Sequence, residues 1–327
     1  MTPFAYSRVS DPNTAIDRAS HGAGVAFIAG GTDMLQLLEE GVQSPLELVD
    51  INGLGFDDVS ETIDGVRIGA MVRLADVADH PLIRERYPVV SDALSETASP
   101  QVRNMATIGG NLLQRTRCLY FRDIATPCNK REPGTGCPAQ DGQNRINAIL
   151  GGSDHCIATY PGDLAIALVA VDAEAMVSSP TGERTIPVEK LHRLPGDTPE
   201  IETVLAPGDL ITAIWIPLSA AGRRSGYLKI RDRASFEWAL ASAAVSLGLD
   251  GDRILEARLA VGGVATKPWR LRHVEDMLVD KRLDRDLARA AGERAVEGAV
   301  PRAGNAFKIP LLGKTVERAL VQVGGLV

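Results

Sequence analysis

Residues 27–35 read FIAGGTDML, in which two glycines separate an apolar run from a segment with helical apolar spacing. The pattern predicts a strand over residues 25–29 and a helix that begins near Met34, joined by a tight turn at Gly30 and Gly31. The backbone N–H groups and the helix dipole at such a turn can hold a pyrophosphate, although the same glycines suit a turn without any ligand. The stretch does not match G-x-G-x-x-G and therefore does not predict a Rossmann dinucleotide site.

A second glycine turn, TIGGN at residues 107–111, lies far from the first in the sequence. Its threonine hydroxyl and its asparagine amide can form hydrogen bonds with a phosphate or with a hydroxyl group of a cofactor. Each turn alone is compatible with a plain loop, but two such turns can clamp one extended cofactor from both sides. We therefore predict one binding site built from both turns.

The apolar patterns in the rest of the chain predict mixed α and β structure up to about residue 220 and a separate α+β part beyond it. The expected strands are 47–51, 65–70, 210–217, 226–231, 239–249 and 254–261, and the expected helices lie within 74–78, 82–96 and 274–321. Residues 164–171 suit a strand or a buried helix equally well.

Composition restricts the classes of partner. The 327 residues carry a net charge of −7, which argues against a nucleic-acid or anionic-membrane surface. No window reaches the roughly 18 apolar residues of a membrane helix, so no membrane span is expected. The first fifteen residues lack the basic and apolar regions of a secretory signal, so we expect no export signal on this chain.

All four cysteines lie within one irregular stretch of 39 residues, which is too long a loop for a compact domain unless something holds it. They are Cys118, Cys128, Cys137 and Cys156. Their spacing is not the paired C-x-x-C pattern of a zinc ribbon, whereas four thiolates are the normal complement of one [4Fe–4S] cluster. Structural zinc and free or disulfide-bonded cysteines are the alternatives. The surrounding arginines and lysines are expected to offset the charge of a cluster and to lower the pKa values of the thiols, or to form a solvated or docking face.

At this point the sequence resembles a known family. Its motifs are AGGTDML (29–35), SPQVRNMATIGGNL (99–112), TYPGDLAIAL (159–168), LAPGDLITAIWIP (205–217) and NAFKIPLLGKTVERAL (305–320). They resemble the FAD-binding subunits of the xanthine dehydrogenase and carbon monoxide dehydrogenase family of molybdenum hydroxylases, over essentially the whole chain.

The resemblance implies an α+β fold of two domains. Residues 1–220 would form a two-lobed FAD-binding domain of the vanillyl-alcohol-oxidase (PCMH) type, with lobes at about 1–54 and 55–220 and an iron–sulfur insertion at 115–156. Residues 221–327 would form a C-terminal α+β domain of the carbon monoxide dehydrogenase flavoprotein type. The positions that match the family's FAD contacts are Phe27, Ile28, Ala29, Gly30, Gly31, Thr32, Asp33, Met34, Thr107, Gly110, Asn111, Asp163, Ile211 and Lys229.

The cysteine insertion resembles that of the flavin subunit of bacterial periplasmic aldehyde oxidoreductases. This resemblance implies a [4Fe–4S] cluster on the four cysteines and a heterotrimer with a large subunit that carries the molybdenum cofactor and a small subunit with [2Fe–2S] clusters. Aldehyde would be oxidised to carboxylate on the large subunit, and this chain would pass the electrons to an external acceptor. The sequence offers no catalytic nucleophile or base pair of its own.

Other assignments remain open at this stage. One is the flavin subunit of a different molybdenum hydroxylase, such as a xanthine dehydrogenase or a hydroxybenzoyl-CoA reductase, and another is a stand-alone flavoprotein with a structural zinc loop. The resemblance favours a periplasmic location reached by co-export with a partner that carries the signal, with a cytoplasmic location as the alternative.

Overall fold

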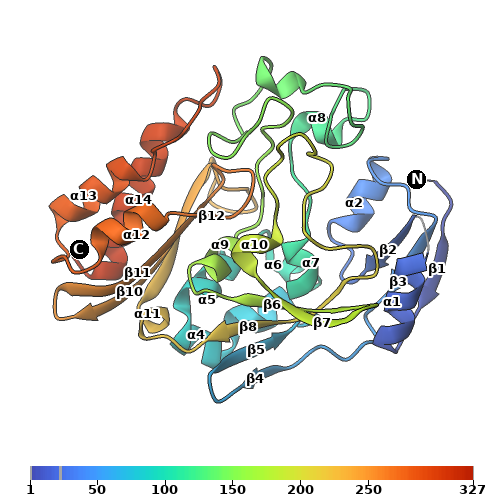
Figure 1. The fold of residues 1–327 in the computed structure, drawn as a ribbon, viewed down its shortest axis with the longest axis horizontal. Helices are drawn as coiled ribbons and strands as arrows, with labels where there is room; N and C mark the ends of the chain where they lie inside the picture. Colours follow the sequence, from blue (N-terminus) through green and yellow to red (C-terminus); the bar gives the residue numbers. More distant parts are fainter. Residues whose placement is uncertain (1, 22–23, 327) are drawn as a thin grey trace.

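Three sheets follow one another along the chain in the computed structural model, which describes residues 2–21 and 24–326 (Figure 1). The first is a small parallel sheet with the strand order β1-β3-β2. Parallel neighbours require crossover connections, which the two N-terminal helices supply. The elements of this lobe are β1 (Ala5–Arg8), α1 (Pro12–His21), β2 (Val25–Ile28), α2 (Met34–Glu39) and β3 (Glu47–Asp50).

The second lobe is built on a five-stranded antiparallel sheet with the order β4-β5-β8-β6-β7. Its strands are β4 (Val59–Glu61), β5 (Gly65–Gly69), β6 (Glu174–Ser179), β7 (Gly182–Pro187) and β8 (Leu210–Pro217). Its helices are α3 (Leu74–Asp79), α4 (Pro81–Arg86), α5 (Pro88–Ser95), α6 (Pro100–Arg103), α7 (Ile108–Leu112), α9 (Leu164–Val169) and α10 (Val188–Leu191).

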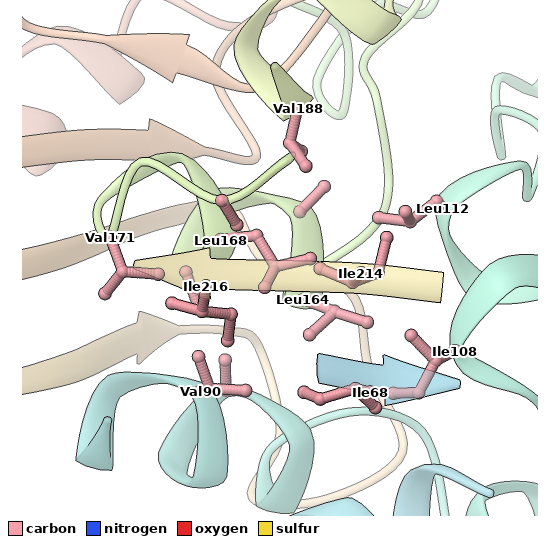
Figure 2. Packing of buried hydrophobic residues seen from close by; sticks show 14 of the residues in the cluster. Ile68, Val90, Ile108, Leu112, Leu164, Leu168, Val171, Val188, Ile214 and Ile216 are labelled. Atoms are coloured by element: carbon pink, nitrogen blue, oxygen red, sulfur yellow. The ribbon is translucent and has the colours of Figure 1, made fainter. Parts of the chain in front are cut away.

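Helix α9 settles the choice between a strand and a buried helix for the apolar run near residue 165. Every residue of α9 is buried, since the helix lies in the middle of the largest hydrophobic core. In Figure 2, Leu164 and Leu168 of this helix lie near Ile214 and Ile216 of β8. A helix that is surrounded by protein requires apolar residues on all of its sides.

The C-terminal part contains the third sheet, which is antiparallel with the order β12-β11-β10-β9. It has a hydrophobic core of its own between this sheet and the C-terminal helices. Its elements are α11 (Ala220–Arg223), β9 (Ser225–Ile230), β10 (Ala241–Asp250), β11 (Arg253–Gly262), β12 (Trp269–Arg270), α12 (Arg272–Leu278), α13 (Arg285–Arg294) and α14 (Lys308–Gly324). No helix in the described residues is long and apolar enough to cross a membrane.

The cysteine insertion is irregular, as expected from its composition. It contains only α8 (Leu119–Arg122) and one 3₁₀ turn, η1 (Pro138–Gln140), and it lies at the top of Figure 1 between α2 and the C-terminal part. The backbone of a long loop needs partners to remain ordered. Here the partners come from both neighbouring domains.

A polar clamp formed by residues 302–308 holds the end of the insertion. Asn305 donates from Nδ2 to the carbonyl oxygens of Asn147 and Ala148 at 3.3 and 3.2 Å. Lys308 donates from Nζ to the carbonyl oxygens of Ile146 and Gly263 at 3.1 and 2.6 Å. Asn305 and Lys308 are both fully buried. The clamp therefore ties the insertion to the start of α14.

Lys308 gives the stability of the protein a distinctive pH dependence. Burial lowers the pKa of this amine to about 7, and nearby Arg145 lowers it further, whereas an unfolded lysine titrates near 10.4. Between these two values the unfolded chain binds more protons, so this contribution to stability is lowest below pH 7 and rises towards pH 10. The slope approaches roughly 1.4 kcal/mol per pH unit inside the window.

We therefore expect Lys308→Met to flatten the rise of unfolding free energy between pH 7 and pH 10, measured by chemical denaturation at a series of pH values. Lys314→Met is the matched control, because Lys314 lies on the same helix with its side chain 73% exposed. The control should follow the wild-type curve. Parallel curves for wild type and Lys308→Met would contradict this account of Lys308.

Candidate functional site

The first glycine turn lies between β2 and α2, as predicted, and the reason for Gly30 is a close approach between two backbones. A Cβ atom added at Gly30 would lie 2.0 Å from the carbonyl oxygen of Met105. Gly31 has a φ of +72°, a conformation that residues with a side chain rarely adopt. The glycines therefore allow the chain around Met105 to lie directly against the first turn.

The second glycine turn differs from the expectation, because its residues form the short helix α7 instead of a loop. Thr107 caps this helix, and its Oγ1 accepts a hydrogen bond from the backbone N–H of Gly110 at 3.3 Å. A threonine at this position satisfies an otherwise unpaired N–H group, which explains why a segment with two glycines is helical.

All fourteen predicted FAD-contacting residues line a single cleft between the lobes and the C-terminal part. The cleft has a volume of about 260 Å³, just below the roughly 300–1,000 Å³ of common small-molecule pockets, and it opens to solvent. The structure thus brings together residues that are up to 202 positions apart in the sequence, from Phe27 to Lys229.

Sequence reasoning missed two further segments that line the same cleft. One is the start of the insertion with the residue before it, Gln114, Arg115 and Arg117, and the other is the aromatic connection 236–238 between β9 and β10. The guanidinium of Arg117 lies over the ring of Trp238 at 5.0 Å from its centroid. The aromatic run SFEW was visible in the sequence, but nothing local placed it beside the glycine turns.

Asn111 carries a polar atom that is suited to a bound group. Its Oδ1 is buried and has no hydrogen-bond partner, and the residue lines the cleft. Buried acceptors without a partner are costly, so such an atom commonly points to a missing donor. A hydroxyl or an N–H group of a flavin nucleotide supplies such a donor, and the cleft therefore fits this class of ligand.

Asp163 forms the centre of a buried polar network at the edge of the cleft. Its Oδ2 accepts from Lys229 Nζ at 2.8 Å and from Thr97 Oγ1 at 3.2 Å, and its Oδ1 accepts from Tyr227 OH at 2.7 Å. Burial, together with the charge of Asp163, raises the pKa of Tyr227 well above its usual value. The network holds Lys229 and Asp163 in fixed positions beside the space for a ligand.

We expect Lys229→Met to lower the free energy of unfolding by about 3–5 kcal/mol, because it leaves Asp163 as an unpaired buried charge. The side chains of this pair are only 1% and 5% exposed. The double variant Asp163→Asn/Lys229→Met should recover much of the loss. The matched control, Arg67→Met, breaks the exposed Arg67–Asp58 pair and should cost about 0–1 kcal/mol. Equal losses in both single variants, measured by urea denaturation, would refute the role of burial.

Asp33 lines the cleft, but both of its carboxylate oxygens are occupied by the cysteine insertion. Oδ2 accepts from the backbone N–H of Arg115 at 2.8 Å, and Oδ1 lies 2.8 Å from Arg117 and 2.9 Å from Arg122. The predicted cofactor residue thus has protein partners that the sequence did not indicate.

The four cysteines of the insertion line one small cavity of about 10 Å³. Cys118, Cys128 and Cys156 are buried, Cys137 is partly buried, and all four are free thiols. Two sulfurs accept hydrogen bonds from the protein. Asn147 Nδ2 lies 3.5 Å from Cys118 Sγ, and the backbone N–H of Ala158 lies 3.4 Å from Cys156 Sγ. Among the described residues, no group of three histidine, cysteine or acidic side chains is placed to hold a single metal ion.

The expected lowering of the thiol pKa values is wrong for two of the cysteines. Burial raises the pKa of Cys137, and it raises the pKa of Cys156 to about 12. The nearby cations do not reverse this effect, because carboxylates already pair with them. Lys130 and Arg115 pair with Glu202. Arg122 pairs with Asp33 and Glu40. Of these cations, Lys130 lowers the pKa of Cys156, but by less than burial raises it.

Comparison with known proteins assigns the chain to a class of flavoproteins. The description "FAD binding domain in molybdopterin dehydrogenase" matches residues 2–219, and "CO dehydrogenase flavoprotein C-terminal domain" matches residues 226–323. The chain belongs to the family of FAD-binding subunits of molybdenum hydroxylases, and it is an oxidoreductase subunit. The predicted α+β fold class and the family resemblance are confirmed.

Individual relatives cover nearly the whole chain. The aldehyde oxidoreductase FAD-binding subunit PaoB of Escherichia coli is 44% identical over 324 residues, which are 98% of each chain. The glyceraldehyde dehydrogenase medium chain of Sulfolobus acidocaldarius is 27% identical and covers 88% of this chain and 84% of its own length. A solved carbon monoxide dehydrogenase of Hydrogenophaga pseudoflava superimposes with a TM-score of 0.75 at 25% identity, over 98% of this chain and 97% of that one.

Proposed function

We propose that this chain is the electron-transfer subunit of a heterotrimeric molybdenum aldehyde oxidoreductase and that it binds FAD and one [4Fe–4S] cluster. The observation that carries the proposal is that all four thiols line one cavity, next to a cleft lined by all the predicted FAD contacts. The insertion contributes to both places, since Arg117 lines the cleft and Cys118 follows it directly.

The FAD site is proposed to use the two glycine segments at its two ends. The backbone N–H groups of the β2–α2 turn would hold the pyrophosphate, as the close approach at Gly30 allows. Asn111 would accept a hydrogen bond from the nucleotide, and the buried Lys229–Asp163 pair would fix the polar edge of the cleft beside Ile211. When bound, the flavin supplies one- and two-electron chemistry that no side chain of this protein offers.

The thiols of Cys118, Cys128, Cys137 and Cys156 are the proposed cluster ligands. Four thiolates complete the ligand set of one cluster, and the four cysteines of this chain line the same cavity. The hydrogen bonds from Asn147 and Ala158 to sulfur are of the kind that tune cluster potentials. A structural zinc ion, by contrast, needs its ligands to converge on one point at about 2.3 Å.

Aldehyde is the proposed substrate of the whole complex because the relative of highest identity described above is an aldehyde oxidoreductase subunit. The proposed partners are a large subunit with the molybdenum cofactor and a small subunit with [2Fe–2S] clusters, and electrons would leave this chain for an external acceptor. We further propose a periplasmic location through co-export with a signal-bearing partner.

Cofactor analysis of the anaerobically purified complex tests this function. Flavin, iron, sulfide and zinc are quantified together with an absorption spectrum, and substrate panels of aldehydes and purines are compared. We expect one FAD, about four irons more than the [2Fe–2S] subunit accounts for, and aldehyde-dependent bleaching of the flavin. Bleaching by purines instead would indicate a xanthine dehydrogenase, and zinc without the additional iron would indicate a structural loop.

A further inference from the structure

The glycine turn and the cysteine insertion are joined at one carboxylate. Asp33 follows the turn directly and accepts three hydrogen bonds or ion pairs, all from insertion residues: the N–H of Arg115 and the guanidinium groups of Arg117 and Arg122. The Asp33 side chain is only 16% exposed, and those of the two arginines are 18% and 11% exposed. Ion pairs this sheltered from water are weakly screened and geometrically demanding.

A hydrophobic contact reinforces the same junction. Leu37, one turn after Asp33 on α2, is buried in a small core with Cys118, Cys128, Cys156 and Phe121. The helix that starts at the glycine turn therefore packs directly on the shell around the thiols. Any displacement of this helix moves both the turn and the wall of the cysteine cavity.

The arginines that pair with Asp33 are close to Cys118 in the sequence. Arg117 immediately precedes Cys118, and Arg122 belongs to the α8 turn that begins after Cys118. Arg122 also donates to the carbonyl oxygen of Thr116 at 2.9 Å, which ties the chain after Cys118 to the chain before it. Asp33 thus fixes the position of the first thiol through the residues on both sides of it.

We propose that Asp33 is a positioning residue that couples the two cofactor sites, so that flavin binding and cluster incorporation favour each other. The proposal rests on the function proposed above. Its physical basis is linkage: when one element must be ordered for two ligands to bind, the ligand that binds first lowers the ordering cost for the second. The coupling is reciprocal for binding free energies.

A double-mutant cycle on the purified complex measures this coupling. The FAD dissociation constant is determined by fluorescence titration of flavin-stripped wild type, Cys137→Ser, Asp33→Asn and the double variant. In the wild-type background, loss of the cluster should weaken FAD binding by about 5–150-fold, the usual range of coupling between sites. In the Asp33→Asn background the same loss should change the dissociation constant by less than about 2-fold, because the connection is already broken.

The controls separate coupling from a general structural defect. Glu40→Gln removes an ion pair with Arg122 from the far end of α2, at a side chain that is 37% exposed, and should keep the wild-type coupling. Arg117→Gln removes one of the three donors and should reduce the coupling partially, which keeps the test valid should Asp33→Asn fail to fold. If Asp33 had only a structural role, Asp33→Asn would weaken FAD binding equally with and without the cluster.

The outcomes distinguish this inference from the proposed function. Wild-type protein without the four additional irons would overturn the cluster assignment itself. In the other case, wild-type protein contains these irons while cluster loss changes the FAD dissociation constant equally in the wild-type and Asp33→Asn backgrounds. That result would overturn only the coupling.

Discussion

Gly30→Ala is expected to abolish flavin binding, with occupancy falling from near one FAD per chain to below roughly a tenth. The added methyl group would lie 2.0 Å from the carbonyl oxygen of Met105 and 2.7 Å from its carbonyl carbon. Both are backbone atoms, which cannot rotate away as a side chain can. The β2–α2 turn must therefore separate from the segment that leads to Thr107, and the cleft loses the close approach of its two glycine segments.

The control for this prediction is Gly55→Ala, at the start of the second lobe. Gly55 has a φ of +70°, but an added Cβ would meet nothing within 4 Å. The variant therefore carries backbone strain of roughly 1–2 kcal/mol without any steric contact, and it should retain its flavin. Flavin content is measured by absorbance after gel filtration. Full flavin in Gly30→Ala, or equal loss in both variants, would show that the close approach is not part of the FAD site.

The sequence predicted the parts of the site that depend on local patterns. A Gly-Gly pair between an apolar strand and a helix identifies a turn wherever it occurs, and β2 and α2 are found where expected. Four cysteines in an irregular stretch likewise indicate a long loop that is kept in place through its cysteines. Both signals are carried by neighbouring residues, so no knowledge of the tertiary structure was needed to read them.

Predictions that depended on long-range partners were less successful. The arginines near the cysteines were expected to act on the thiols, but most of them pair with carboxylates from other segments, such as Asp33 and Glu202. Helix α7 was read as a loop because its glycines conceal the cap that Thr107 provides. The clamp at residues 302–308 had no local signal at all, because its buried groups bond to backbone carbonyls between 45 and 162 positions away.

Asp33 shows the same distinction, and its assignment as an FAD contact stays a prediction. Its position in AGGTDML indicates proximity to the turn, and it does line the cleft. The direction of its carboxylate, however, depends on where the insertion folds back, and no local pattern encodes that fold. Sequence motifs thus locate a residue near a site more reliably than they assign its hydrogen-bond partners.

Cys137→Ser is expected to remove about four irons from the complex while FAD remains bound at saturating concentration. Cys137 borders the cysteine cavity together with the other three thiols but lies outside the FAD cleft. A serine hydroxyl is a poor ligand for iron, so a four-thiolate cluster loses one of its attachments and is not retained. Iron and sulfide analysis, with absorbance near 400 nm and flavin quantitation on the same sample, provides the measurement.

His155→Gln is the matched control for this prediction, because His155 borders the same cavity but its side chain is 49% exposed and contributes no thiol. It should leave the iron content unchanged. Unchanged iron in Cys137→Ser would mean that the insertion carries no cluster, and loss of zinc would assign it to a structural ion. In either of these cases the chain would keep its place as a flavin subunit, because the FAD cleft does not include the thiols, and electrons would have to reach the flavin without passing through the insertion.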